Sequence, residues 1–159
     1  MSDITSRSLD QGIEYVTFSI DGRWFGAQVS DVHDVFAIQA VTPVPLARAD
    51  VAGLLNLRGR IVTAIDARRR LGMPARTGGY AGAMAIGVER EGESYGLVVD
   101  AVGEVLRLNE DIREDAPGNL DESWREVACG VFRLPKGLLV ALDISKMLDA
   151  APATTAAAA

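Results

Sequence analysis

The sequence predicts an all-β protein made of two five-stranded barrels in tandem, packed together and accompanied by short helices. Strand signals dominate the chain, its two halves repeat each other, and each half is only about 60 residues long. A unit of that size is too small for a sandwich, whereas a five-stranded barrel closes on itself and removes its own edges. Because each barrel alone would have a marginal core, we expect the two to pack through apolar surface as one body.

Two hairpins provide the clearest strand signals. The first comprises residues 14–20 and 24–29 around an Asp21-Gly22 turn. The second comprises residues 83–88 and 95–99 around a Glu91-Gly92 turn. A residue pair ending in Gly between two strand-like segments is typical of a tight β-hairpin.

The halves of the chain align with each other at two offsets. A shift of 70 places Phe25-Gly26 on Tyr95-Gly96, and it also matches three spaced valines in each half: Val29, Val32 and Val35 on Val99, Val102 and Val105. A shift of 77 places Gly53 on Gly130 and matches two apolar segments that end in aspartate: Ala64-Ile65-Asp66 on Ala141-Leu142-Asp143. The order of elements is the same in both halves, which predicts a duplicated architecture.

The repeat also predicts the domain organisation. One domain should span residues 14–149, with a first subdomain at about 14–76 and a second at about 80–149. Thr77-Gly78-Gly79 is the best candidate for the linker between them. We expect residues 1–13 to be a flexible tail and the alanine-rich residues 150–159 to be disordered.

The composition excludes several classes of protein. A single cysteine excludes an internal disulfide, and with one histidine in the chain a zinc site is not expected. The net charge of −6 argues against nucleic acid and anionic membranes as partners. No apolar run reaches the roughly 18 residues that cross a bilayer, and no signal peptide is evident, so we expect a cytoplasmic protein without membrane insertion.

The charge is nevertheless uneven along the chain. Residues 48–76 contain seven arginines and two acids, whereas residues 104–126 contain eight acids and three arginines. We expect these opposite charges to help decide which surfaces of the protein meet a partner.

Residues that could support catalysis have simpler structural explanations, so we predict that the protein is not an enzyme and holds no cofactor or metal. His33 is the only histidine that could act as a base, and it is expected to be a surface or structural residue. Cys129 is expected to be a small core residue. Because Asp66 and Asp143 are equivalent in the repeat, they are interpreted as caps of short helices at 67–71 and 144–148 rather than as an acid–base pair.

Residues 53–62 (GLLNLRGRIV) have two interpretations that the residues alone leave open. Asn, Gly and Arg are common in a solvated hairpin turn. Arginine between apolar residues is also the preferred charge for a desolvated contact with a partner. In the second half Arg58 falls opposite Pro135, so this charge belongs to one half only.

At this segment the sequence resembles the CheW family, the coupling proteins of bacterial chemotaxis, and the resemblance covers roughly residues 14–149. It rests on a set of short motifs in a shared order: Tyr15-Val16-Thr17-Phe18, Phe25-Gly26, Val32 to Val35, Thr42-Pro43-Val44-Pro45, Gly53, Asn56-Leu57-Arg58-Gly59-Arg60-Ile61-Val62, Val98-Val99-Asp100, Val102, and Leu139 to Asp143. The sequence departs from the family pattern at His33, Ala67 and the basic run Arg68-Arg69-Arg70.

The resemblance implies SH3-like barrels and a non-enzymatic adaptor that joins the cytoplasmic tip of a chemoreceptor to the histidine kinase CheA. The receptor would lie along a groove between the barrels, and the regulatory domain of the kinase would bind at the barrel ends. The resemblance carries five residues over to the receptor groove, as lining or support: Val32, Asp34, Asn56, Arg58 and Val99. It also implies a location at membrane-associated receptor clusters.

A second hypothesis remains beside the adaptor. A cleft between two barrels could bind a small molecule, or it could hold the carboxylates of a small hydrolase. Nothing in the sequence supports this alternative beyond the expected cleft.

Overall fold

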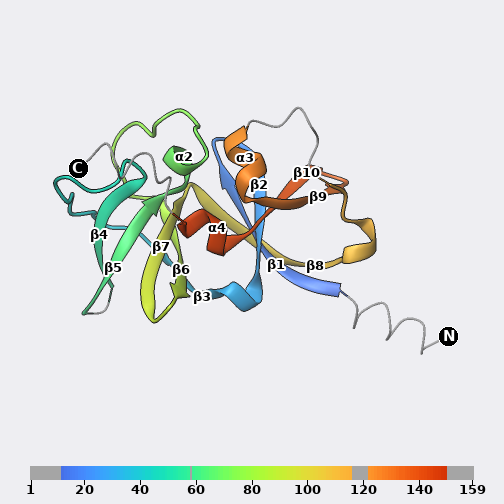
Figure 1. Ribbon diagram of the computed structural model, residues 1–159, viewed down its shortest axis with the longest axis horizontal. Helices are drawn as coiled ribbons and strands as arrows, with labels where there is room; N and C mark the ends of the chain where they lie inside the picture. The colour runs from blue at the N-terminus through green and yellow to red at the C-terminus, as the bar shows by residue number, and fades with distance from the viewer. Residues whose placement is uncertain (1–11, 58, 116–121, 150–159) are drawn as a thin grey trace.

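The computed structural model describes residues 12–57, 59–115 and 122–149, and in them ten strands form two five-stranded sheets. Barrel A has the strand order β8-β1-β2-β10-β9, and barrel B has the order β3-β6-β7-β5-β4 (Figure 1). The strands of barrel A are β1 (Gly12–Ile20), β2 (Arg23–Gln28), β8 (Ala101–Asn109), β9 (Ala128–Leu134) and β10 (Gly137–Leu142). Those of barrel B are β3 (Val32–Ala37), β4 (Val51–Leu57), β5 (Arg60–Asp66), β6 (Met84–Arg90) and β7 (Glu93–Val99). The short helices are η1 (Val29–Asp31), α2 (Ala67–Arg70), η2 (Glu110–Ile112), α3 (Glu122–Val127) and α4 (Ile144–Leu148). The predicted all-β fold of two packed barrels with short helices is confirmed.

The internal repeat is confirmed strand by strand. Replacing each strand number in barrel A by its equivalent in the other half turns the order of barrel A into the order of barrel B. Each barrel contains one parallel pair at the same place, β2 with β10 and β7 with β5. The two predicted hairpin turns are also equivalent, since Asp21-Gly22 and Glu91-Gly92 have positive φ at both residues, as a tight two-residue hairpin requires.

The expected division of the chain at residues 76–80 is wrong, because barrel B is continuous from Val32 to Val99 and lies between the two segments that form barrel A. The physical reason is the length of the connection between β7 and β8. Only Asp100 separates β7 from β8, and one residue cannot make a two-residue hairpin, so the strand continues into the other barrel. The three residues of η1 carry β2 into β3 in the equivalent way. Residues 77–79 lie within barrel B and do not link the barrels.

The start of β1 tests part of the predicted N-terminal tail. Strand β1 begins at Gly12, and Gly12 and Ile13 pair with Asn109 and Leu108, so the expectation that these two residues belong to a flexible tail is wrong. Residues 1–11 and 150–159 lie outside the described residues.

Three apolar clusters form the core, and two of them are equivalent. The cluster of barrel A includes Tyr15, Phe132 and Leu139, and the cluster of barrel B includes residues at the matching positions, among them Ala85, Leu55 and Val62. The largest cluster draws on both barrels and contains four of the most deeply buried side chains: Phe18, Phe25, Ile65 and Ile86. The barrels therefore share one apolar core.

The arginines of the basic run Arg68-Arg69-Arg70 bind backbone and side-chain groups of neighbouring elements. Arg69 donates to the backbone carbonyls of Ala49 and Val51, and Arg70 donates to that of Lys146. Elsewhere in the basic half, Arg48 binds Asp50 through two hydrogen bonds. These hydrogen bonds position the arginines on the fold, and the expectation that the uneven charge helps decide which surfaces meet a partner stays a prediction.

Asp100 anchors the crossing from barrel B to barrel A. Its carboxylate accepts hydrogen bonds from Arg68 and Arg76, both at 2.7 Å, and from the backbone N–H of Asp21 at 2.6 Å. Burial opposes ionisation of Asp100, but the hydrogen bonds from Arg68 and Asp21 and the nearby arginine charges outweigh it, and the pKa of Asp100 is lowered. One carboxylate thus holds α2, the loop after it and the β1–β2 turn together.

Replacing Asp100 by asparagine should lower the free energy of unfolding at pH 7 by about 2 kcal/mol, because two partly buried arginines lose their counter-charge. A lowered pKa gives stability that is fully present above the unfolded-state pKa of about 3.9 and disappears as the pH falls through the folded-state value. The difference between wild type and Asp100→Asn in urea unfolding should therefore shrink in acid. The exposed pair of Arg90 and Asp149 provides the control, since Asp149→Asn should cost less than about 1 kcal/mol. A difference that stays constant down to pH 3 would contradict the assignment.

Candidate partner-binding site

The predicted groove residues occupy three elements of barrel B. Val32 and Asp34 lie on β3, Asn56 lies near the end of β4, and Val99 is the last residue of β7. Arg58 lies outside the described residues, between Leu57 and Gly59. The structure therefore places Val32 and Asp34 on one strand, and the position of Arg58 stays a prediction.

Asn56 shapes the turn that carries Arg58. Its side-chain oxygen accepts a hydrogen bond from the backbone N–H of Gly59 at 3.1 Å, and Gly59 has a φ of +85°. A side-chain amide that bonds to the backbone three residues later is a common way to close a turn. The segment is thus the β4–β5 hairpin, as one of its two interpretations predicts, and its role in partner binding remains a prediction.

Asp34 lines a small hollow of about 40 Å³ on barrel B. Arg60 lines the same hollow and donates a hydrogen bond to Ser94 at 2.5 Å. A second, larger hollow of about 450 Å³ lies between the end of β3 and strand β4, and Asn56 lines it. Phe36 and Leu57 line both hollows, so Asp34 and Asn56 belong to one uneven concave face.

Val99 cannot line that face. Its side chain is 1% exposed and belongs to the core cluster shared by the two barrels. Of the two roles that the resemblance carries over to Val99, lining or support, its position in the core allows only support. Val32 is half-buried and packs against the same cluster, whereas Asp34 is exposed.

Apolar residues that the sequence reasoning did not select are exposed at equivalent positions of the two barrels. Val35 on β3 is 37% exposed and Val105 on β8 is 52% exposed. Ile61 on β5 is 60% exposed and Leu138 on β10 is 42% exposed. Each pair is matched by the same shifts of 70 and 77 that identify the repeat. The signal was present in the alignment of the halves, but the alignment does not say which matched residues face outward.

The residues considered for catalysis have structural positions. Asp66 and Asp143 accept hydrogen bonds from backbone N–H groups at the starts of α2 and α4, which confirms them as caps. His33 is an exposed surface residue whose ring lies 3.6 Å from Glu89. Cys129 is exposed, so its expected place in the core is wrong; β9 turns its side chain outward, while the buried Gly130 beside it approaches Arg113 and Glu114.

The described part of the chain contains no group of three or more His, Cys, Asp or Glu residues that could hold a metal ion. Within the same residues, no helix has the length and apolarity needed to cross a bilayer.

Comparison with known proteins agrees with this architecture. The model of the CheW-like domain matches residues 14–151. The chain is 26% identical to the chemotaxis protein CheW of Treponema pallidum, over 88% of this chain and 84% of that protein. It is 28% identical to a probable chemotaxis protein CheW of Rhizobium etli, over 90% of this chain and 92% of that protein. The crystal structure of the scaffolding protein TtCheW from Thermoanaerobacter tengcongensis superposes with a TM-score of 0.75 at 27% identity, covering 88% of this chain and 94% of that one. The duplicated pair of barrels and the match over nearly its whole length show that the chain belongs to the CheW family.

Proposed function

We propose that the protein is a non-enzymatic chemotaxis adaptor that couples the cytoplasmic tips of chemoreceptors to the histidine kinase CheA in signalling arrays. The observation that carries the proposal is the CheW-family pair of barrels with apolar side chains exposed at matching positions of both. Exposed apolar side chains among polar neighbours are typical of protein-binding surfaces. The adaptor would act in the cytoplasm, at membrane-associated receptor clusters.

The receptor contact is proposed on barrel B. Asp34 and the exposed Val35 are near neighbours on β3, and Asn56 closes the turn on which Arg58 is carried. In this arrangement Asp34 and Arg58 provide charges of opposite sign that can orient a helical partner. Val35 supplies apolar contact area on the other face of β3, and because β3 is at one end of the strand order of barrel B, a helix along that edge can meet both faces. Val32 and Val99 support the strands from the core side.

The kinase contact is proposed at the ends of the barrels, through the regulatory domain of the kinase. Ile61 and Leu138 are exposed there at equivalent positions on β5 and β10. An adaptor with two similar ends can bind a partner at each end, which is what a scaffold in an array requires.

The proposal is tested by capture of the tagged chain from its native lysate, read by mass spectrometry. Wild type should recover a chemoreceptor and a histidine kinase. Arg58→Glu and Val35→Glu should lose the receptor while their thermal unfolding stays close to wild type. Val44→Glu is the matched control, because Val44 is 39% exposed but lies outside β3 and β4. Wild type that recovers neither partner would overturn the adaptor function, and loss of folding in Arg58→Glu would make that arginine structural.

A further inference from the structure

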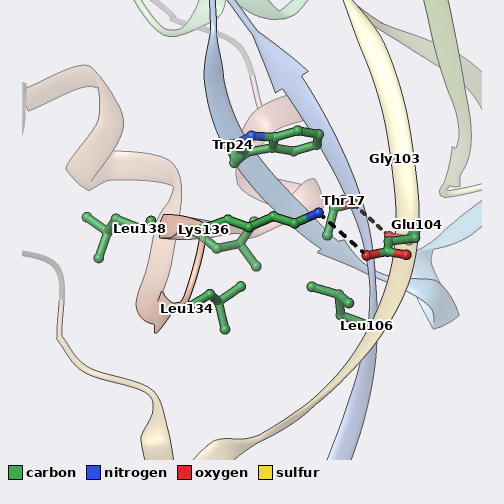
Figure 2. A pocket seen from close by; sticks show the side chains of 10 residues that line it. Thr17, Trp24, Gly103, Glu104, Leu106, Leu134, Lys136 and Leu138 are labelled. Atoms are coloured by element: carbon green, nitrogen blue, oxygen red, sulfur yellow. Dashed lines mark hydrogen bonds and ion pairs between the residues drawn. The ribbon is translucent and has the colours of Figure 1, made fainter.

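A hollow on barrel A is assigned no ligand by the adaptor function, although Leu138 at its rim also belongs to the proposed kinase contact. It is an open hollow of about 280 Å³, lined mainly by apolar side chains, with a charged residue on either side of its opening. Figure 2 shows Trp24 above Thr17 and Glu104, with Leu134, Leu138 and Leu106 around the remaining sides. For comparison, an engineered apolar cavity of ~150 Å³ in another protein binds benzene, so this volume accommodates an aromatic ring with a short chain.

The internal repeat provides a matched reference for this hollow. Its counterpart is the hollow of about 40 Å³ on barrel B, and most lining positions correspond under the shifts of 70 and 77. Barrel B carries bulkier or more polar side chains at two of these positions, where barrel A carries glycine: His33 against Gly103, and Arg60 against Gly137. At a third position Trp24 replaces Ser94 and provides an aromatic wall. The hollow is therefore open on barrel A and nearly closed on barrel B.

The residues around Gly103 explain why the barrel A copy stays open. A Cβ at Gly103 would lie 2.7 Å from the hydroxyl of Thr17 and 3.0 Å from the ring of Trp24, so a side chain there would push against both. In barrel B the corresponding acid, Asp34, folds over Gly87, at which a Cβ would meet its carboxylate at 2.1 Å. Thr17 occupies the position of Gly87 in barrel A and binds the backbone carbonyl of Glu104 at 2.6 Å. The carboxylate of Glu104 therefore stands outward, 71% exposed, beside the opening.

The opening of the hollow carries one charge of each sign. The ammonium of Lys136 lies 4.0 Å from the carboxylate of Glu104, and both side chains are more than two thirds exposed. Figure 2 shows Lys136 reaching across toward Glu104 from the side of Leu138. Such an exposed, loosely held pair contributes little to stability, which leaves both charges available to a ligand.

We propose that this hollow binds a free α-amino acid with a large apolar side chain, such as phenylalanine. The side chain would pack on Trp24 and the leucines, the carboxylate would bind Lys136, and the ammonium would bind Glu104. A zwitterion satisfies both charges at the opening, whereas a ligand with one charge leaves the other residue without a counter-charge.

The test is titration of the purified chain with L-phenylalanine, followed by 1H–15N NMR. Saturable shifts should be confined to residues around the hollow, with the indole N–H of Trp24 among them. Two probes separate the charges: 3-phenylpropionate lacks the ammonium and 2-phenylethylamine lacks the carboxylate. Each should bind about tenfold more weakly than L-phenylalanine.

Variants then assign each part of the site. Trp24→Ser introduces the residue found in the closed copy and should abolish binding, while Trp24→Phe should retain it. Lys136→Gln should weaken the binding of L-phenylalanine and 3-phenylpropionate, which carry a carboxylate, but leave the binding of 2-phenylethylamine unchanged. Glu104→Gln should weaken the binding of L-phenylalanine and 2-phenylethylamine, which carry an ammonium, but leave the binding of 3-phenylpropionate unchanged. Ser94→Ala in the closed copy should have no effect. The proposal is overturned if no saturable shift occurs at 20 mM ligand (roughly the weakest affinity of interest), or if all three probes bind equally, since the charges would then play no part.

Discussion

Replacing Gly53 by alanine is expected to destabilise the protein by about 3 kcal/mol or more, a large fraction of the total stability of a typical domain. Gly53 has a φ of +148°, and a Cβ there would lie 2.2 Å from the carbonyl oxygen of Thr42. That oxygen accepts the backbone N–H of Leu54, and the N–H of Thr42 donates to the Leu54 carbonyl. The new methyl group therefore collides with backbone and must break this bridge.

The repeat offers a matched control for the effect of Gly53→Ala. Gly130 is the equivalent residue, with a φ of +156°, but a Cβ there meets chiefly the flexible side chain of Arg113 and lies 3.0 Å from the Glu114 carbonyl. Gly130→Ala should cost about 1–2 kcal/mol, and Gly92→Ala, at positive φ in open space, about 1 kcal/mol. Urea unfolding followed by circular dichroism measures all three. Equal losses for Gly53→Ala and Gly130→Ala would show that φ alone, and not the collision with Thr42, sets the cost.

Local rules predicted the parts of this fold that depend on short-range chemistry. The Asp21-Gly22 and Glu91-Gly92 turns and the caps Asp66 and Asp143 need only a few neighbouring residues, and all four are confirmed. The repeat predicted the shared strand order for the same reason, since both halves carry the same local signals.

The exchange of strands between barrels was not predictable from those signals. It depends on whether the chain turns back after β7 or continues into the other barrel. The feature that decides this is the lack of a two-residue turn around Asp100, since β8 begins at Ala101. The choice between lining and support for Val99 was open for a related reason. A valine in a β-branched run has the same pattern whether it faces a groove or the core, so the repeat identified the strand but not the direction of its side chain.

Substitution of Trp124 by alanine should lower the free energy of unfolding by about 4 kcal/mol. Trp124 is 6% exposed, its ring lies 5.2 Å from that of Phe25, and its indole N–H donates a hydrogen bond to the Leu71 carbonyl at 2.9 Å. One side chain on α3 thus joins barrel A to the end of α2 on barrel B, and its removal leaves a cavity in the shared core together with an unpaired carbonyl.

Two further variants serve as comparisons. Trp124→Phe should keep most of the packing and lower the free energy of unfolding by only about 1–2 kcal/mol, because it loses the hydrogen bond and the second ring of the indole. Trp24→Ala is the control for tryptophan content, because that ring is 41% exposed and its removal should cost less than about 1.5 kcal/mol. Urea unfolding followed by circular dichroism, which does not depend on either indole, provides the comparison. If Trp124→Ala proves no more harmful than Trp24→Ala, the barrels are held together without α3.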